Sequence, residues 1–190
     1  MKEIISDEFN AHISAANLLH SLTDIVAKSA QLCISSLNNG GKILIFGNGG
    51  SAADAQHIAA EMVGRYKIDR NGLPAIALTT DSSILTAIGN DFGYTQVFAR
   101  QVKALANKGD VLIGISTSGS SANVINALKI SKDLGCKAIG FSGGDGGKMN
   151  KACDINIVVP NEDTPRIQEI HIVVGHTICH LIDQAINGQL

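Results

Sequence analysis

The chain has 190 residues, of which 45% are hydrophobic and 17% charged, and its formal net charge is −2. This length suits one domain with a sizeable core, and the composition disfavours both a disordered chain and a basic nucleic-acid-binding surface. Aromatic residues make up only 4%, so stacking platforms for single-stranded nucleic acid are not expected either. With few charges and 20 glycines, we expect apolar helix surface that a small monomer could not cover, which favours an oligomer.

No segment has the pattern of a signal peptide or a membrane span. The first residues include acidic side chains, and no stretch approaches the roughly 18 apolar residues that a span needs. The cysteines are scattered with no CxxC pair, so neither a disulfide framework nor a cysteine-based zinc site is indicated. We therefore expect a cytoplasmic protein without membrane or nucleic-acid partners.

In chain order, helical periodicity comes first and is followed by an alternation of strands and helices. Residues 1–38 carry apolar residues at helical spacing, which predicts two helices that break near Ser21. The strands expected after them are short apolar runs bounded by Gly, Asp or Pro, at 42–46, 74–78, 110–115, 136–141 and 154–159. The helices expected between and after the strands lie near 51–64, 82–89, 94–107, 121–134 and 165–187.

Continuous apolar strands that alternate with helices favour a parallel sheet covered on both faces. The sequence therefore predicts a single doubly wound α/β domain over residues 1–190, with N-terminal helices at 1–38 and the α/β core at 39–190. In such folds ligands bind beyond the carboxyl ends of the strands, near the point where the strand order reverses.

A glycine-rich loop follows the first expected strand and leads into a helix. Its residues are Gly47-Asn48-Gly49-Gly50-Ser51. Glycine lets the backbone approach a ligand closely, and the free amides of a helix N-terminus suit a phosphate. The spacing is not that of a dinucleotide fingerprint, and no acidic residue ends the second strand near Ala77. Phosphate binding is therefore favoured over NAD binding.

A second loop, Ser116-Thr117-Ser118-Gly119-Ser120-Ser121, follows the third expected strand. It lacks the lysine of a P-loop, so hydroxyls and amides would have to hold the ligand, as suits a sugar phosphate. The alternative is that these serines only cap the next helix. A second glycine-serine loop beside the first favours ligand binding.

His57 and Glu61 lie four residues apart on the helix that follows the first loop, so they share one face. An exposed polar pair is the simplest interpretation of such spacing. The C-terminal helix favours a functional role for the pair instead. Its polar residues Gln168, His171 and His176 stand among apolar residues and would need partners if buried, and His57 and Glu61 could be those partners.

Together these motifs resemble the phosphoheptose isomerases of the sugar-isomerase (SIS) domain superfamily. The resemblance covers nearly the whole chain and rests on Gly47-Asn48-Gly49-Gly50-Ser51, His57-x-x-x-Glu61, Gly64-Arg65-Tyr66, Gly89-Asn90-Asp91-Phe92-Gly93, Ser116-Thr117-Ser118-Gly119 and Arg166-Ile167-Gln168-Glu169-Ile170-His171 with His176. It implies a single SIS domain with a five-stranded parallel sheet, and a homotetramer. It also implies interconversion of sedoheptulose 7-phosphate and D-glycero-D-manno-heptose 7-phosphate, which supplies heptose precursors for bacterial surface glycans such as lipopolysaccharide or capsule.

The resemblance also implies roles for individual residues. The zinc-ligand positions are His57, Glu61, Gln168 and His176, with one zinc per subunit, and the acid/base positions are Glu61 and His176. The substrate-binding positions are Asn48, Gly49, Gly50, Ser51, Glu61, Asn90, Asp91, Ser116, Thr117, Ser118, Ser121 and Gln168.

Helix geometry adds an expectation about the zinc ligands. Gln168 and His176 are eight residues apart, or about 12 Å along a helix axis, whereas two ligands of one zinc lie only about 3–4 Å apart. One unbroken helix could hardly supply both to one ion. We therefore expect one of them to come from a neighbouring subunit, which places the site at an interface.

Two other functions compete with the isomerase. The segment 78–88 resembles that of a non-catalytic tetrameric SIS protein that binds the bacterial replication initiator. That relative lacks the acidic residue at the position of Glu61 and the histidine at that of His176, and both are present here. A sugar-phosphate-sensing regulator would need a DNA-binding domain, for which the chain has neither spare length nor a basic patch. The isomerase is favoured.

Overall fold

The computed structural model covers residues 1–190, and its centre is a five-stranded parallel sheet with the strand order β2-β1-β3-β4-β5. The strands are β1 (Ile43–Gly47), β2 (Ala75–Ala77), β3 (Val111–Ser116), β4 (Lys137–Gly143) and β5 (Ile155–Val159). In the register, Ile43 lies beside Ala75 on one side and Val111 on the other. All five predicted strands are confirmed, with β2 shorter than expected and β4 two residues longer at its carboxyl end.

Helices connect and flank the strands. They are α1 (Lys2–Ala16), η1 (Asn17–Leu22), α2 (Thr23–Asn38), α3 (Gly50–Val63), α4 (Ser82–Phe92), η2 (Tyr94–Gln96), α5 (Val97–Leu105), α6 (Ala122–Lys129), α7 (Met149–Ala152) and α8 (Thr164–Ile186), where η denotes a 3-10 helix. The expected break near Ser21 is the 3-10 segment η1. The four-residue α7 was not predicted, because one turn is too short to show a periodicity.

One predicted helix is too long. Helix α6 ends at Lys129, and the chain turns over the next six residues instead of continuing to 134. Gly135 closes this turn with a φ of 68°, a left-handed conformation that glycine adopts without steric cost. The turn brings the chain directly into β4, so α6 covers its strands with only two turns of helix.

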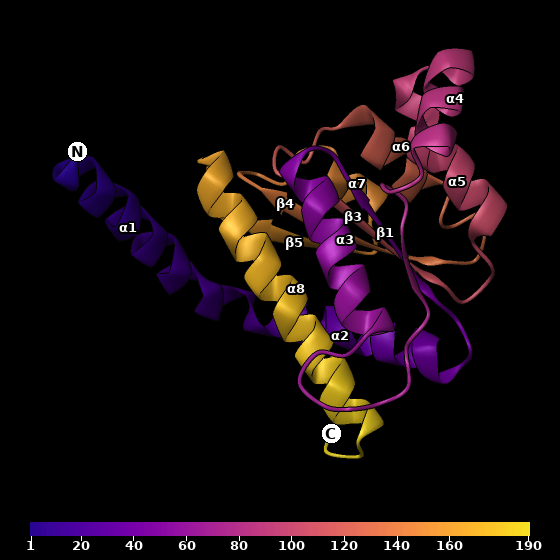
Figure 1. Ribbon diagram of the computed structural model, residues 1–190, viewed down its shortest axis with the longest axis horizontal. Helices are drawn as coiled ribbons and strands as arrows, with labels where there is room; N and C mark the ends of the chain where they lie inside the picture. The colour runs from indigo at the N-terminus through magenta and orange to yellow at the C-terminus, as the bar shows by residue number, and fades with distance from the viewer.

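Alternate residues of β1 face opposite layers of helices. Ile43 and Ile45 belong to a core packed under α2, α3 and α8, whereas Leu44 and Phe46 belong to a second core under α5, α6 and α7. Figure 1 shows these two layers, with α3 and α8 side by side in front of the sheet. Because both faces are covered, the three central strands β1, β3 and β4 are almost fully buried, which explains why they read as continuous apolar runs rather than as alternating patterns.

The predicted N-terminal helices behave differently from each other. Helix α2 packs against α8 and the sheet, while α1 projects from the body of the molecule (Figure 1). Arg166 of α8 holds α1 through the carbonyl and the carboxylate of Glu8, but Ile4, Phe9 and Ile13 remain exposed along α1. Such apolar surface is what the composition led us to expect.

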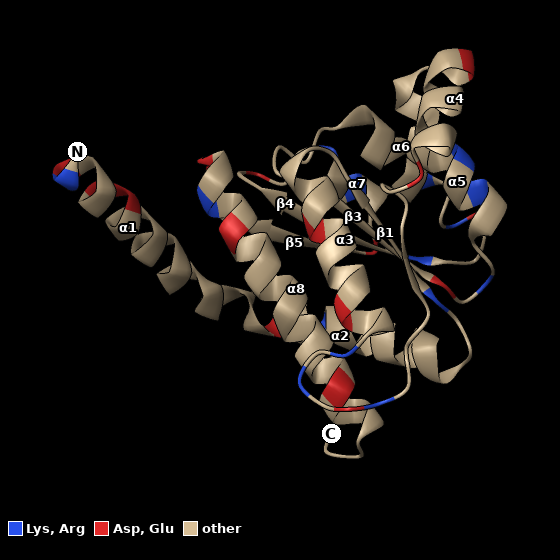
Figure 2. Cartoon of the chain, in the orientation of Figure 1, with Lys and Arg blue, Asp and Glu red and all other residues tan.

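The charged residues are sparse and mixed in sign. Figure 2 shows Lys and Arg positions dispersed among Asp and Glu positions rather than gathered along one helix. No helix of the chain combines the length and the apolar character that a bilayer crossing requires.

Candidate active site

The strand order places the two glycine-serine loops next to each other. Strands β1 and β3 are neighbours, and the order reverses between them, so the crevice beyond their carboxyl ends is where this class of sheet binds ligands. The first loop leaves β1 at Gly47, whose register partner is Ile115 near the end of β3. The loop 116–121 begins at the next residue, so both predicted loops reach the same crevice.

The first loop leaves the start of α3 uncapped. Gly49 is the N-cap residue, with a φ of 56° that requires glycine, and it has no side chain with which to satisfy the first amides of the helix. Gly50 packs closely on α8, since a methyl group there would lie 2.7 Å from the Gln168 side-chain nitrogen. The helix therefore offers free amides and a partial positive charge at the point where a phosphate is expected.

In the second loop the serine hydroxyls bond to each other rather than to the helix. Ser121 is the N-cap residue of α6 but makes no side-chain cap hydrogen bond, and its hydroxyl lies 2.9 Å from that of Ser116. The alternative that these serines only cap a helix is therefore not what the structure shows for Ser121. A hollow of about 380 Å³ adjoins this loop, and its lining includes Thr117, Ser118, Gly143 and Gly144.

An amide pair that no sequence motif predicted joins the first loop to α6. Asn48 and Asn123 donate to each other's side-chain oxygens at 2.9 and 2.8 Å, and the Tyr94 hydroxyl donates to Asn48 at 3.3 Å. Asn123 is buried, so its amide orients Asn48 from beneath. Asn123 lies only two residues beyond the second loop, but nothing in its spacing identified it.

Asn90 and Asp91 lie near the carboxyl end of α4. Both are exposed in the last turn of α4, where the Asn90 amide donates to the Asp91 carboxylate at 2.8 Å. Neither side chain hydrogen-bonds to either glycine-serine loop, so the role of these two residues in substrate binding stays a prediction.

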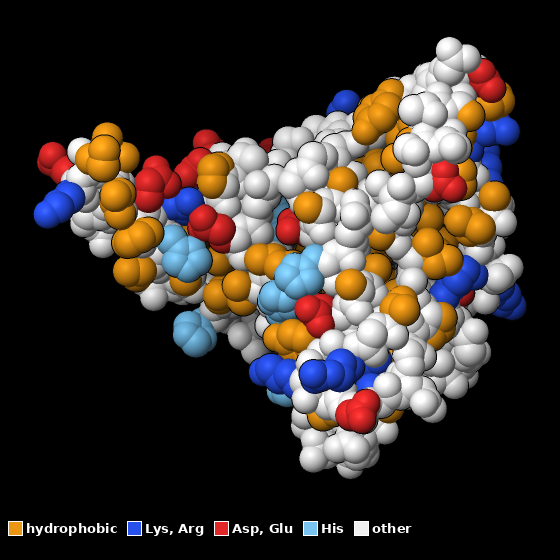
Figure 3. All heavy atoms as spheres, viewed as in Figure 1, with side chains coloured by type: hydrophobic (Ala, Val, Ile, Leu, Met, Phe, Trp, Pro, Cys, Tyr) orange, Lys and Arg blue, Asp and Glu red, His pale blue; other side chains and the backbone are white.

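Three of the predicted zinc ligands meet between α3 and α8. His57 Nε2 lies 3.1 Å from Glu61 Oε1 and 3.3 Å from His176 Nε2, and the ligand atoms of the three residues all lie within 4.8 Å of one another. We refer to these three residues as the His57–Glu61–His176 cluster. Figure 3 shows histidine and acidic side chains gathered near the middle of the face that α3 and α8 form. His57 is 48% exposed and Glu61 23%, so a small molecule can reach them.

Tyr66 completes one side of this cluster. Its ring stacks on that of His176 with 5.4 Å between centroids and an interplanar angle of 15°. The resemblance drew attention to the Gly64-Arg65-Tyr66 segment but assigned no role to the tyrosine. Only the folded chain places this loop against α8.

Gln168, the fourth predicted zinc ligand, is separated from the other three along both α3 and α8 of the same chain. It packs against Gly50 in the first turn of α3, whereas His57 is seven residues, or about 10 Å, further along that helix. Along α8 it precedes His176 by the eight residues noted above. Gln168 therefore borders the first loop, as its predicted substrate-binding role requires.

Asp54 and His171 lie near the site and have shifted pKa values. Burial raises the pKa of the Asp54 carboxyl, and the nearby His57 lowers it by a smaller amount. The Asp54 Oδ2 atom has no hydrogen-bond partner. Burial lowers the pKa of His171 to about 4, although a hydrogen bond to the Ser142 carbonyl favours its protonation. His171 is fully buried, so it supports the end of β4 rather than facing substrate.

The donor set of the cluster fits zinc. Two imidazole nitrogens and one carboxylate are the ligands of several catalytic zinc sites, which keep a further position open for water or substrate. The two Nε2 atoms and the Oε1 atom converge without any backbone partner between them. The cluster can therefore hold a metal, or it can act directly as a carboxylate and an imidazole within reach of one substrate.

Comparisons with known proteins show the family and agree with the fold. The model of the SIS domain family matches residues 9–143. The phosphoheptose isomerase of Aliarcobacter butzleri is 62% identical over 188 residues, which covers 98% of this chain and 100% of that protein. The solved structure of phosphoheptose isomerase GmhA from Neisseria gonorrhoeae has a TM-score of 0.91 at 47% identity and covers 96% of this chain and 98% of that one. The solved structure of a phosphoheptose isomerase from Francisella tularensis has a TM-score of 0.92 at 39% identity, and it covers 96% of this chain and 97% of that one.

Proposed function

The chain belongs to the phosphoheptose isomerases, a family of SIS-domain sugar-phosphate isomerases, and we propose that it interconverts sedoheptulose 7-phosphate and D-glycero-D-manno-heptose 7-phosphate. The observation that carries this proposal is the pairing of a crevice lined by two glycine-serine loops with the His57–Glu61–His176 cluster on adjoining elements. The heptose product would supply precursors for bacterial surface glycans such as lipopolysaccharide or capsule.

The two loops would hold the phosphate end of the sugar. The free amides at the start of α3, with Ser51 and the hydroxyls of Ser116, Thr117, Ser118 and Ser121, offer donors without a fixed positive side chain. Gln168, which packs on Gly50, would contact the sugar from α8. Asn90 and Asp91 stay predicted substrate ligands, and their exposed position on α4 suits contact with the crevice of a neighbouring subunit.

Aldose–ketose isomerisation moves a proton between adjacent carbons through an enediol(ate), and a second proton between their oxygens. In our proposal the Glu61 carboxylate takes the proton from carbon 1 of the ketose and returns it to carbon 2. His176 passes the proton between the two oxygens, and Tyr66 fixes the plane of its imidazole. His57, within 3.1 Å of Glu61, keeps that carboxylate oriented.

Zinc is the cofactor that this donor set suits best, held by His57, Glu61 and His176, with Gln168 as the fourth predicted ligand. When bound there, zinc would supply a Lewis acid for the carbonyl oxygen of the substrate. An amide is an uncommon zinc ligand, and a weak ligand at the fourth position suits a site that must admit substrate.

We further propose that the site is completed in a homotetramer. In one chain, Gln168 of α8 packs on the start of α3, whereas His57 and Glu61 lie about two and three turns further along α3. A Gln168 from a neighbouring subunit would resolve this separation. The exposed apolar residues of α1, which include Phe9 and Ile13, offer surface that subunit association would bury.

The test is to incubate the purified protein with sedoheptulose 7-phosphate and to follow formation of the aldose, with and without a chelator. We expect conversion that the chelator abolishes and added zinc restores. Conversion that survives complete metal removal would contradict the metal assignment alone. No conversion under any condition would contradict the isomerase and favour the non-catalytic SIS protein that binds a replication initiator.

A further inference from the structure

We propose that the buried ion pair of Arg70 and Asp183 positions the His57–Glu61–His176 cluster, because it ties the end of α3 and the following loop to α8. We call this loop, residues 64–74, the Tyr66 loop. We refer to this pair as the clamp. The proposal rests on the proposed function only for the role of the cluster, since the clamp and its contacts are features of the fold itself.

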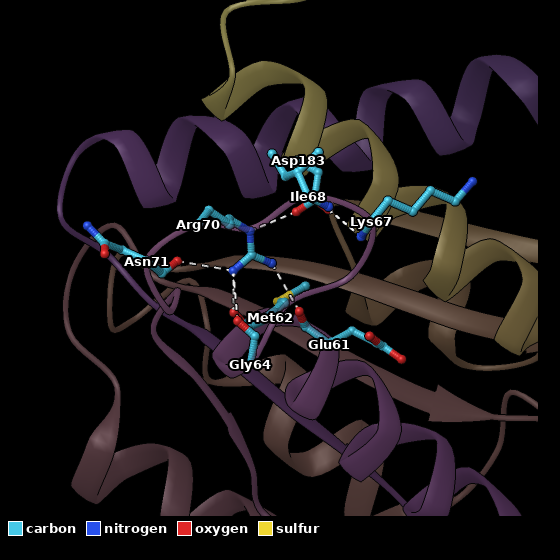
Figure 4. Close-up of polar contacts among 8 residues, drawn as sticks. All are labelled: Glu61, Met62, Gly64, Lys67, Ile68, Arg70, Asn71 and Asp183. Carbon is cyan, nitrogen blue, oxygen red and sulfur yellow. Dashed lines mark hydrogen bonds and ion pairs between the residues drawn. The ribbon is translucent and has the colours of Figure 1, made fainter.

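Arg70 closes the carboxyl end of α3. Its Nη1 donates to the Met62 carbonyl at 2.8 Å and its Nη2 donates to the Glu61 carbonyl at 3.0 Å, as Figure 4 shows. These are carbonyls of the last helical turn, which have no partner within the helix. The guanidinium therefore fixes the backbone of Glu61, the residue whose carboxylate enters the cluster.

Asp183 anchors the guanidinium on the other helix. Its Oδ1 accepts from Arg70 Nε at 2.7 Å, and both side chains are nearly inaccessible, at 5% and 0% exposure. Asp183 follows His176 by seven residues, or about two helical turns, so both lie on the same face of α8. The clamp thus spans the same two helices as the cluster, next to the end of α3 that carries Glu61.

The clamp also sets the loop that carries Tyr66. Asp183 Oδ2 accepts from the Lys67 amide at 2.9 Å and more weakly from that of Ile68, and Arg70 Nη1 donates to the Asn71 carbonyl at 3.1 Å. These bonds fix Lys67 and Ile68 on one side of Arg70 and Asn71 on the other. Lys67 directly follows Tyr66, so the position of Tyr66 is restrained as well. Because the Tyr66 ring stacks on His176, the clamp reaches the cluster from a second direction.

A second buried ion pair provides a comparison within the same chain. Asp110 accepts from Lys42 Nζ at 2.6 Å and from the amides of Lys42 and Asn107, and it is only 2% exposed. It therefore matches Asp183 in burial and in accepting hydrogen bonds from two backbone amides. Asp110 and Lys42 lie immediately before β3 and β1, at the amino end of the sheet, and hold no part of the cluster. Loss of either carboxylate should cost stability, but only loss of Asp183 should disturb the cluster.

The experiment uses Asp183→Asn and Arg70→Lys, with Asp110→Asn as the matched control. Asparagine keeps the shape of Asp183 but cannot accept all of its bonds as a carboxylate does. Lysine at position 70 keeps the charge but cannot donate to Asp183, Glu61 and Met62 together, because it lacks the planar fork of arginine. All three full-length proteins are first compared by thermal melting.

The first measurement needs no metal. Stacking on Tyr66 shifts the carbon-bound proton signals of the His176 imidazole, which are identified in the NMR spectrum by their loss in His176→Gln. We expect this shift to diminish in Asp183→Asn and Arg70→Lys and to be retained in Asp110→Asn. The second measurement is zinc affinity by competition with a chelator, where we expect a loss of about 10- to 100-fold for the two clamp variants and no change for the control.

The proposal is overturned if both clamp variants keep the His176 signals of the wild type, or if Asp110→Asn disturbs them equally at an equal loss of melting temperature. A wild-type protein without isomerase activity would contradict the proposed function and leave the NMR comparison to decide on the clamp. A wild-type protein that binds no zinc would contradict the cofactor assignment, and the same NMR comparison would again decide.

Discussion

The two glycine-serine loops and the His57–Glu61–His176 cluster belong to one candidate site, but they are built in different ways. Each loop is a run of neighbouring residues whose backbone conformation follows from its own glycines, such as Gly49 with its φ of 56°. In the cluster, by contrast, His57 and His176 are 119 residues apart and meet only because α3 packs on α8. The conformation of each proposed phosphate-binding loop is therefore a local property of the chain, whereas the proposed chemistry depends on tertiary packing.

This difference separates binding from turnover in mutants. Changes in the loops should act mainly on KM, since they remove uniform binding, while changes in the cluster should act on kcat, since they remove groups that move protons. The predictions that follow test this division, beginning with the largest expected effect.

Glu61→Gln should lower kcat by about 10²- to 10⁴-fold, because an amide cannot take the carbon-bound proton. The melting temperature should change little, since the only side-chain ion pair of Glu61 is with the half-exposed His57. Steady-state kinetics with sedoheptulose 7-phosphate measures the effect, and Asp69→Asn, an exposed carboxylate in the Tyr66 loop, is the control. Near-normal turnover in both Glu61→Gln and His176→Gln would contradict the assignment of the acid and base.

On the side of the loops, we expect the stability of the fold to depend on pH through His171, which hydrogen-bonds to the Ser142 carbonyl at the end of β4, beside the second loop. Its pKa in the folded chain is about 4, against an ordinary value of 6.5, because burial disfavours the imidazolium. Between these two values the unfolded chain binds the extra proton and the folded chain does not, so stability falls as the pH falls. We expect a loss of about 3 kcal/mol between pH 7 and pH 4 from this one group.

Urea unfolding of wild type and His171→Gln across this pH range measures that loss. The variant should start less stable at pH 7 and show a shallower decline towards pH 4. His20→Gln removes an exposed histidine and should leave the wild-type slope unchanged. Equal slopes for wild type and His171→Gln would show that this buried imidazole does not cause the pH dependence.

Ser118→Ala should raise KM about tenfold with kcat nearly unchanged, which is the value of one hydrogen bond to a charged phosphate. Ser118 is exposed and its hydroxyl accepts only a long bond from the Ser120 amide, so the fold should tolerate the change. Ser120→Ala in the same loop is the matched control and should leave both constants intact. A fall in kcat rather than a rise in KM would break the division between the loops and the cluster.

Gly175→Ala tests the packing that brings the cluster together. A methyl group there would lie 2.6 Å from the Cδ1 atom of Ile58, so either the buried Ile58 side chain or the packing of α3 on α8 must shift beside His176. The cost should be about 1 kcal/mol, since overpacking outweighs the gain of helix propensity. Chemical denaturation measures it, and Ile58→Val, which removes the clashing methyl, should recover part of the loss in the double variant. Additive losses in the double-mutant cycle would contradict this contact.

Much of the fold follows from short stretches of sequence. The five strands are apolar runs whose edges are set by glycine, aspartate and proline, and a strand buried on both faces needs no long-range information to be recognised. The lengths of the helices were less predictable, because the end of α6 depends on the turn at Gly135. The resemblance supplied the ligand positions, of which the folded chain brings together His57, Glu61 and His176.

The residues that support the site were not predicted, and the reason is physical. Arg70 and Asp183 are 113 residues apart, and a polar residue at one position of a helix gives no sign of the partner that will neutralise it. The same holds for Asn48 with Asn123 and for Tyr66 with His176. Local sequence determines backbone conformation through steric limits on φ and ψ, so it determined the strands and the conformation of each loop, while the pairing of β1 with β3 brings the two loops together. Side chains from distant segments meet only when apolar burial packs their helices together, so the tertiary structure alone decided the geometry of the cluster and of the clamp that holds it.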